Sequence, residues 1–248
     1  MAPLSDGFSE NFAALNRNKR SLSLDLKDPA AIATVRRLVA DSEVLIENNR
    51  PGVMARLGLG YAALRELNAR LVYCSISAYG QSGPRAQEGG FDLTVQAMSG
   101  VMHVTGEPGR PPVKCGVPLA DFSAGLYAGF AILAALRLAT SSGQRSHLDI
   151  PMLGATLGIA ALQTSEYFGS GRDPVALGSA HPRNAPYRVF ASSDGYFGYG
   201  GRQQRAVARG VRNHCAPGLA QRPALRHAHH PRRASGRATG LARADLQA

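Results

Sequence analysis

The chain of 248 residues contains no tryptophan, only three cysteines and few aromatic residues of any kind, at 6% of the sequence. The cysteines (Cys74, Cys115 and Cys215) are odd in number and lack the spacing of metal ligands. We therefore expect reduced thiols in a cytoplasmic protein and no metal site. The first residues have neither a basic nor an apolar stretch, so no secretory signal is recognised.

Long hydrophobic runs are also scarce. The longest, Ala124 to Leu136, is shorter than the roughly 20 residues that cross a bilayer, and Arg137 ends it. We therefore expect no membrane partner. With 44% hydrophobic residues, the chain can nevertheless bury a full core.

Acidic residues are nearly absent from the last part of the chain. Residues 201–248 hold ten Arg and one acidic residue, Asp245, so +9 of the net charge of +11 lies there. The segment is either a basic tail that binds nucleic acid through its phosphates or a frame-shifted translation of GC-rich DNA. We favour the frame shift and expect no nucleic-acid partner, because interleaved aromatic residues are missing. We expect this segment to be disordered.

Before residue 150, short apolar strands alternate with segments of helical periodicity. This alternation predicts an α/β fold with a mostly parallel sheet flanked by helices. Asp28 and Pro29 supply a helix cap and a first helical residue. The expected strands are residues 21–26, 44–46, 71–77 and 146–150, and a β-hairpin is expected at residues 187–192 and 196–199. The expected helices are residues 30–40, 53–57, 61–67, 91–104, 118–139 and 152–168.

The segment Cys115-Gly-Val-Pro-Leu-Ala-Asp121 leads directly into one predicted helix. It places the carboxylate of Asp121 in the first turn, where unpaired backbone N–H groups and the helix dipole favour the ionised form. An ionised, partly desolvated carboxylate is a competent nucleophile toward an activated acyl carbon. The alternative is an aspartate that only caps the helix.

Six segments carry a joint pattern of residues, order and spacing. They are Asn18-Lys-Arg-Ser-Leu-Ser-Leu-Asp-Leu-Lys27, Glu47-Asn-Asn-Arg-Pro-Gly-Val-Met-Ala-Arg-Leu-Gly58, Ser77-Ala-Tyr-Gly-Gln-Ser-Gly-Pro84, Gly90-Phe-Asp-Leu-Thr-Val-Gln-Ala-Met-Ser-Gly100, Gly116-Val-Pro-Leu-Ala-Asp121 and Pro186-Tyr-Arg-Val-Phe190. Together they resemble the class III CoA-transferases, the CaiB/BaiF or formyl-CoA transferase family. The resemblance covers roughly residues 14–200 and implies part of a Rossmann-like large domain.

The resemblance implies transfer of CoA from an acyl-CoA donor to a carboxylic acid. Asp121 matches the catalytic carboxylate, which forms an acyl anhydride and then an aspartyl-CoA thioester. No cofactor is bound permanently, since CoA and acyl-CoA are substrates. Arg56 and Lys27 match positions that contact the phosphate-bearing end of CoA, and Asn48 matches a position that lines the CoA site.

One position separates this family from related α-methylacyl-CoA racemases. The racemases carry a histidine where this chain has Phe91, and racemisation needs a proton acceptor and a donor on opposite faces of the α-carbon. Phe91 can be neither, so the chain is interpreted as a transferase. His103 and His181 have no metal-like partners and are interpreted as ordinary residues.

The resemblance also predicts missing parts. Family members begin with a further strand–helix–strand unit and continue past the hairpin with a smaller domain, and both help to form interlocked-ring homodimers. We recognise neither here, so we expect residues 1–200 to be an incomplete large domain and residues 201–248 an Arg-rich tail. The alternative function is an inactive, truncated family member or scaffold fragment, and dimerisation of this chain is doubtful.

Overall fold

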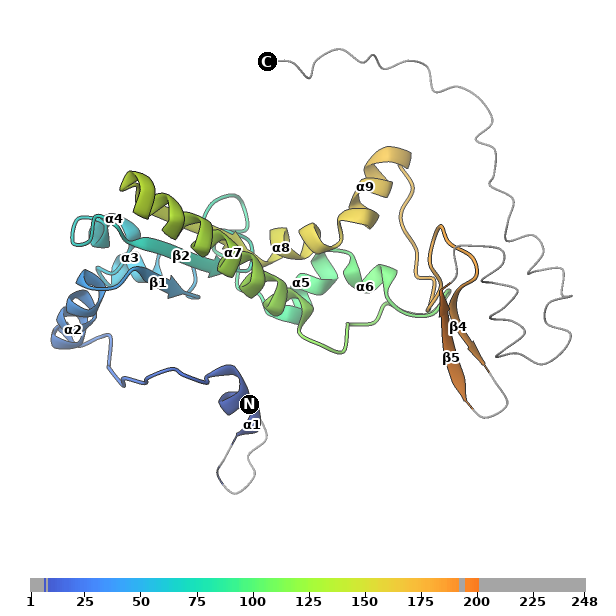
Figure 1. The fold of residues 1–248 in the computed structure, drawn as a ribbon, viewed down its shortest axis with the longest axis horizontal. Helices are drawn as coiled ribbons and strands as arrows, with labels where there is room; N and C mark the ends of the chain where they lie inside the picture. The colour runs from blue at the N-terminus through green and yellow to red at the C-terminus, as the bar shows by residue number, and fades with distance from the viewer. Residues whose placement is uncertain (1–6, 8, 192–194, 201–248) are drawn as a thin grey trace, which may run out of the picture. The chain divides into compact units, whose positions relative to one another are not determined.

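The computed structural model describes residue 7, residues 9–191 and residues 195–200 (Figure 1). The described residues form two compact units. The first unit takes its residues from the chain up to residue 98 and from residues 117–159. The second takes its residues from 99–116 and from residue 160 onward. The predicted Arg-rich tail, residues 201–248, lies outside the described residues.

A three-stranded parallel sheet organises the first unit. Its order is β1 (Val44–Glu47), β2 (Val72–Ser77) and β3 (Ser146–Pro151). Because the strands are parallel, their carboxyl ends meet at one edge. This sheet confirms the predicted α/β fold, and three of the four predicted strands are present.

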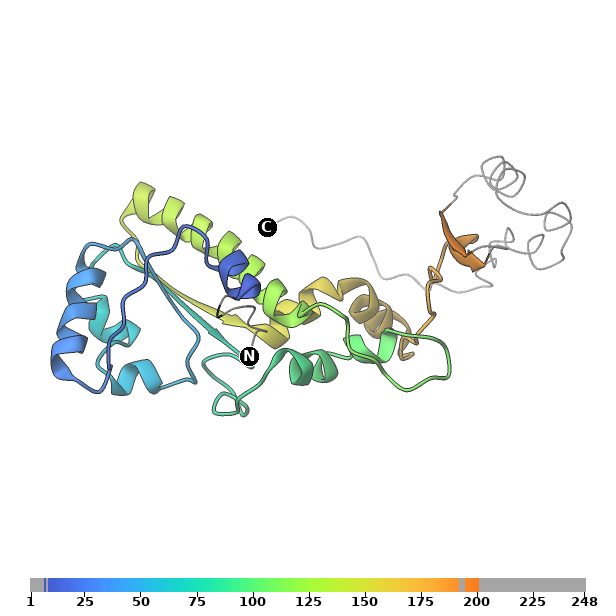
Figure 2. The same ribbon diagram turned by 90° about the horizontal axis from the view of Figure 1, so that it is seen from below.

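Helices cover both faces of the sheet, so β2 is buried almost throughout. On one face, Tyr73 packs with α2 (Pro29–Ala40), α3 (Val53–Arg56) and α4 (Tyr61–Leu64). On the other face, the neighbours of Tyr73 in β2, Val72 and Cys74, pack against α7 (Leu119–Ser142). Figure 2 shows the strands between α7, in yellow-green, and the blue and cyan helices.

The long helix α7 approaches the sheet closely because its inward face is built of small residues. The buried residues of α7 are Ala120, Ser123, Ala124, Ala128, Ile132, Ala135 and Ala139. By length and composition alone, this helix of 24 residues is long and apolar enough to cross a membrane. The sequence argument that residues 124–136 are too few to cross a bilayer therefore does not hold, because the helix extends beyond them at both ends. One face of α7 nevertheless packs against β2 and β3.

Three predicted elements differ from the structure. Residues 21–26 form no strand, because an alternating pattern becomes a strand only beside a partner, and the described part of the chain offers none. The helix predicted at 91–104 is two helices, α5 (Asp92–Met98) and α6 (Val101–Val104), since Gly100 adopts a left-handed φ of 77° between them. The helix predicted at 152–168 is likewise α8 (Met152–Ile159) and α9 (Ala161–Ser170).

The remaining elements are short. Helix α1 (Glu10–Leu15) begins at the capping side chain of Ser9, and α2 begins at the capping carboxylate of Asp28, as predicted. The predicted hairpin is confirmed by the antiparallel pair β4 (Tyr187–Ala191) and β5 (Tyr196–Gly200). This hairpin belongs to the second unit together with α6 and α9.

Candidate active site

Asp121 lies in the first turn of α7, where its carboxylate is exposed. The preceding residue, Ala120, is fully buried and packs with Ala78, which directly follows β2, and with Val95 of α5. This packing of small side chains holds the first turn of α7 at the carboxyl edge of the sheet. Ligands of open α/β sheets bind at that edge.

The start of α7 is capped by a residue from another helix. Pro118, at the cap position, forms no side-chain hydrogen bond to the helix. Instead, the Oδ1 atom of Asp92 in α5 accepts a hydrogen bond of 2.9 Å from the backbone N–H of Ala120. The amide group of Gln96 donates to the other oxygen of Asp92 at 2.8 Å.

The electrostatic environment of Asp121 differs from the one predicted. Partial desolvation raises the pKa of the Asp121 carboxyl above its usual value, and the negative charge of Asp92 raises it further. The prediction that the helix start favours the ionised form is therefore wrong. The first reason is the partial burial of the carboxyl, and the second is Asp92, which takes the N–H of Ala120 and brings another negative charge to this end of α7.

The loop after β2 is tied closely to its surroundings. Gly90 lies so near Ala78 that a Cβ atom on Gly90 would come within 2.7 Å of the Cβ atom of Ala78. The N–H of Gln81 donates to the Asp149 carboxylate of β3 at 2.8 Å, and the N–H of Leu153 donates to the carbonyl of Ala78 at 3.0 Å. These contacts fix the chain between β2 and α5 beside the first turn of α7.

Asn48 directly follows β1, at the same edge of the sheet. Its side-chain amide donates a hydrogen bond of 2.7 Å to the carbonyl oxygen of Ile76 in β2. Asn48 is exposed at this edge. The structure therefore brings Asn48 and Asp121 to one edge of the sheet.

Two guanidinium groups lie beside the turn that follows Asn48. The Arg56 guanidinium folds back over Gly52, where its Nη1 atom would lie 3.2 Å from a Cβ atom. The Arg50 guanidinium covers Gly89 in the same way, at 3.0 Å. Both arginines are exposed, and within the described ranges neither forms an ion pair with an acidic side chain. They can therefore receive an anionic ligand.

Lys27 has no described contact with Asn48, Arg56 or Asp121. It is exposed in the turn before α2, where its backbone N–H donates to the Asp25 carboxylate at 3.0 Å. Of the four residues predicted for the site, Asn48 and Arg56 follow β1 and Asp121 begins α7 at the same edge of the sheet, while Lys27 has no described contact there. The roles of all four stay predictions.

A serine–histidine pair lies on the face of the sheet that α2, α3 and α4 cover. Ser75 Oγ lies 3.0 Å from His147 Nε2, and burial lowers the pKa of His147 although Asp149 and Glu47 oppose this. His147 itself is exposed, but Ser75 is only 1% exposed, so no substrate reaches the serine hydroxyl. The pair is therefore not a candidate nucleophile and base.

Neighbouring Cys74 is buried as well. Burial, assisted by the charges of Glu47 and Asp149, raises the pKa of the Cys74 thiol to about 11. A thiol with so high a pKa is a poor nucleophile near neutral pH. Within the described ranges, no cluster of three or more His, Cys, Asp or Glu residues could hold a metal ion.

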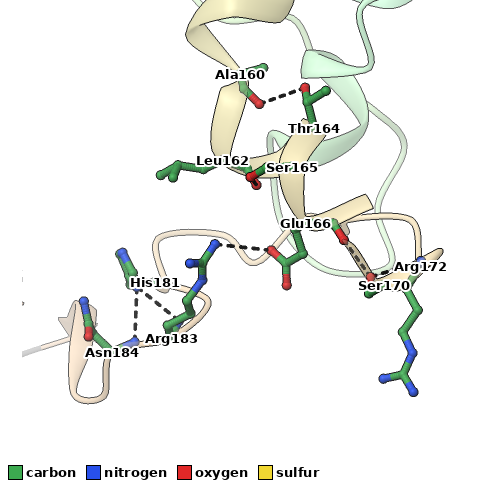
Figure 3. A network of polar contacts seen from close by, with 10 residues as sticks. All are labelled: Ala160, Leu162, Thr164, Ser165, Glu166, Ser170, Arg172, His181, Arg183 and Asn184. Carbon is green, nitrogen blue, oxygen red and sulfur yellow. Dashed lines mark hydrogen bonds and ion pairs between the residues drawn. The ribbon is translucent and has the colours of Figure 1, made fainter. Parts of the chain in front are cut away.

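The second unit contains its own polar network, around α9 (Figure 3). The Nδ1 atom of His181 accepts hydrogen bonds of 3.1 Å from the backbone N–H groups of Arg183 and Asn184. The Arg183 guanidinium lies 3.9 Å from the Glu166 carboxylate. His181 therefore shapes a loop, as expected of an ordinary histidine.

Asp92 and Gln96 are the site residues that the sequence analysis missed. Asp92 caps α7 from a position 28 residues before Ala120 in the chain. The polar Gln96 within an otherwise apolar helical pattern was the available signal, since a buried amide needs partners.

Comparison with known proteins places these observations in a family. The family described as CoA-transferase family III matches residues 1–245. The succinate–glutarate CoA-transferase of Agrobacterium fabrum is 46% identical over 185 residues, covering 75% of this chain and 46% of that protein. The human succinyl-CoA:glutarate CoA-transferase is 36% identical over 201 residues, covering 80% and 46%.

A solved structure agrees with the sequence matches. A CaiB/BaiF family protein from Brucella suis is similar with a TM-score of 0.78 and 36% identity, over 90% of this chain and 59% of that one. The chain spans about half the length of the two curated relatives. On its sequence and its fold, this chain belongs to CoA-transferase family III.

Proposed function

We propose that this chain acts as a CoA-transferase that moves CoA from an acyl-CoA donor to a carboxylic acid, with Asp121 as the nucleophile. The observation that carries the proposal is the exposed Asp121 carboxylate on a first turn that is otherwise closely packed. The turn is fixed, yet the carboxylate is open to a substrate. Its raised pKa is consistent with a more basic, and therefore more nucleophilic, carboxylate.

The reaction would proceed in four balanced steps without net proton transfer. An oxygen of Asp121 attacks the thioester carbonyl, the C–S bond breaks, and an acyl anhydride and CoA thiolate form. The thiolate then attacks the Asp121 carbonyl carbon, which releases the donor acid and leaves an aspartyl-CoA thioester. The acceptor carboxylate and the returning thiolate repeat these steps in reverse order. A carboxylate suits each exchange because it is both a nucleophile and a leaving group.

Binding of CoA is proposed at the turn that follows β1. The guanidinium of Arg56 would pair with phosphate oxygens, for which its planar fork of donors is well shaped. Asn48 would line the same site, and Lys27 would add a second cation. The support is that Asn48 and Arg56 follow β1 at the edge of the sheet where Asp121 lies.

The names of the relatives suggest the acid. Both curated relatives act on succinyl and glutaryl groups according to their names. We therefore propose a dicarboxylate such as glutarate as the acceptor, with succinyl-CoA as the donor. Cytoplasmic location stays a prediction, and the homodimer is predicted for the family rather than for this chain.

The test is to trap the intermediate. The full chain is incubated with succinyl-CoA, digested and searched by mass spectrometry for a CoA adduct on the peptide that contains Asp121. Hydroxylamine should convert this adduct into a hydroxamate at the same residue. Asp121→Asn should abolish the adduct, and turnover with glutarate should fall by at least about a thousandfold.

A matched variant controls for reaction at surface carboxylates. Asp41 is an exposed aspartate at the end of α2, so Asp41→Asn should leave the adduct unchanged. The proposal is wrong if the wild-type chain yields no adduct, or if the adduct persists on another carboxylate in Asp121→Asn.

A further inference from the structure

The first turn of α7 depends on a carboxylate from outside the helix. The first N–H groups of any helix have no partner within it and need an acceptor. Pro118 supplies none, and the Oδ1 atom of Asp92 accepts from the Ala120 N–H at 2.9 Å. A bond between residues 92 and 120 ties α5 directly to the residue that precedes Asp121.

Gln96 holds Asp92 in this position. Its side chain is completely buried, and its Nε2 atom donates to Asp92 Oδ2 at 2.8 Å. The same atom lies 3.5 Å from the carbonyl oxygen of Val117, at the limit of a hydrogen bond. Gln96 therefore contacts the backbone before Pro118, at Val117, and Asp92 contacts the backbone after it, at Ala120. Because Gln96 is buried, any arrangement in which its amide loses Asp92 leaves a buried donor unsatisfied, which favours the observed one.

We propose that Asp92 is a positioning residue for Asp121, acting as a long-range cap that Gln96 holds against the first turn of α7. The inference rests on the proposed role of Asp121 as nucleophile. Asp92 is not proposed to contact the substrate. It sets the direction in which the first turn presents the Asp121 carboxylate, and its charge sets how readily that carboxylate ionises.

The charge effect has a single source among the described residues packed around α7. Asp92 of α5 raises the pKa of Asp121, and α8 carries no ionisable side chain. The ionisable groups of β2 and β3 are Tyr73, Cys74, His147 and Asp149, and none of them contributes to the shift. Removal of the Asp92 charge should therefore lower the pKa of Asp121, although desolvation keeps it above the usual value.

Asp92→Asn tests the charge while an acceptor oxygen remains for Ala120. Aspartate labelled with ¹³C at Cγ is introduced into the full chain, and the Asp121 resonance is identified by its loss in Asp121→Asn. The midpoint of the Asp121 titration should move to lower pH in Asp92→Asn. If turnover is measurable, the acid limb of kcat/KM should move in the same direction.

Asp92→Ala tests the hydrogen bond. Loss of the acceptor should speed hydrogen exchange of the backbone amides of residues 119–121. It should also lower kcat about 10- to 100-fold with little change in KM for acyl-CoA, since a misdirected nucleophile binds substrate but reacts slowly. If Asp92→Ala does not fold, Gln96→Met leaves Asp92 in place and removes the amide that donates to Asp92 and approaches Val117, and the same faster exchange is expected.

Asp28→Asn is the matched control. Asp28 caps α2 through a bond of 2.9 Å to the Ala30 N–H, so this variant also removes the charge of a capping carboxylate but away from Asp121. It keeps the acceptor oxygen of the cap and should leave the Asp121 titration unchanged. The proposal is overturned if the Asp121 titration is the same in Asp92→Asn and wild type, or if Asp28→Asn shifts it equally. The Asp121 titration and the hydrogen exchange of residues 119–121 do not require turnover. Absence of an aspartyl-CoA adduct would therefore contradict the proposed function but not the positioning role of Asp92.

Discussion

The side-chain amide of Asn48 donates a hydrogen bond of 2.7 Å to the carbonyl oxygen of Ile76, which joins the end of β1 to β2. Ile76 is the next-to-last residue of β2, where the last carbonyl groups begin to lose strand partners. The bond therefore stabilises the carboxyl edge and orients the amide of Asn48 at the same time. A proposed ligand-binding residue is thus held by the sheet itself.

Asn48→Ala should weaken CoA binding more than it weakens the fold. Loss of one hydrogen bond at an exposed residue should cost about 0.5–1.5 kcal/mol of unfolding free energy. The KM or Kd for CoA should rise several-fold, because the turn that leads to Arg56 is no longer held to β2. Isothermal titration calorimetry and urea unfolding measure the two effects separately.

Asn68→Ala provides the comparison for Asn48. The amide of Asn68 donates to the carbonyl oxygens of Val39 and Ser42, near the start of β2 and so at the opposite edge of the sheet. This variant should lower stability at least as much as Asn48→Ala but leave CoA affinity unchanged. Equal losses of CoA affinity in the two variants would show that Asn48 acts only through the fold.

Arg56→Gln should reduce affinity for CoA about 10- to 150-fold, because a hydrogen bond to a charged phosphate contributes roughly 1.5–3 kcal/mol. The loss should be smaller for dephospho-CoA if the guanidinium contacts the 3′-phosphate. Arg56→Lys should recover only part of the affinity, since an ammonium group lacks the planar fork.

Arg70 is a suitable control for Arg56, since it is exposed just before β2, at the amino edge of the sheet. Arg70→Gln should leave CoA binding unchanged. If it weakens binding as much as Arg56→Gln does, the attraction comes from overall positive charge, and raising the salt concentration should remove it in both variants.

Local patterns in the sequence predicted the parts of the fold that local forces decide. The alternation of apolar strands and helices predicted the parallel sheet, and Asp28-Pro29 predicted the start of α2. Residues 21–26 show the limit of such a pattern, because strand formation requires a neighbouring strand. The break at Gly100 was missed because helical spacing of apolar residues continues across it.

Only one residue of the candidate site stands out in the sequence by its local position. Asp121 was predicted in the first turn of a long helix, and the structure places it there. The pairing of Asp92 with Ala120 is not visible in the sequence, since it depends on how α5 packs against α7. The pKa of Asp121 was predicted in the wrong direction, because the helix dipole was given more weight than desolvation of the carboxyl and the charge of Asp92 was not foreseen.

Gly90→Ala should destabilise the first unit by about 1–3 kcal/mol, as expected for overpacking of a tight contact. The new methyl group would lie 2.7 Å from the Cβ atom of Ala78, which cannot move without shifting the backbone after β2. Thermal unfolding measures the loss. Gly129→Ala is the contrast, since a Cβ atom there meets nothing within 4 Å and Gly129 lies inside α7. It should stabilise the chain by up to about 1 kcal/mol through helix propensity.

Asp121→Asn should make the chain more stable at neutral pH. The folded state raises the pKa of Asp121, so the ionised carboxylate is less favourable in the folded than in the unfolded chain. Below the unfolded pKa, about 3.9 for an aspartate, Asp121 is protonated in both states and the variant should gain nothing. The gain should appear as the pH rises through the folded pKa and then persist.

Urea unfolding of wild type and Asp121→Asn from pH 3 to pH 8 measures this difference, and a double-mutant cycle separates its causes. In an Asp92→Asn background the gain from Asp121→Asn should shrink, because the charge of Asp92 is one of the two causes of the raised pKa. It should not vanish, because desolvation, the larger cause, remains. If the wild-type chain is more stable than Asp121→Asn at pH 7, the pKa of Asp121 is not raised in the folded state. The ionised carboxylate would then not be destabilised by folding.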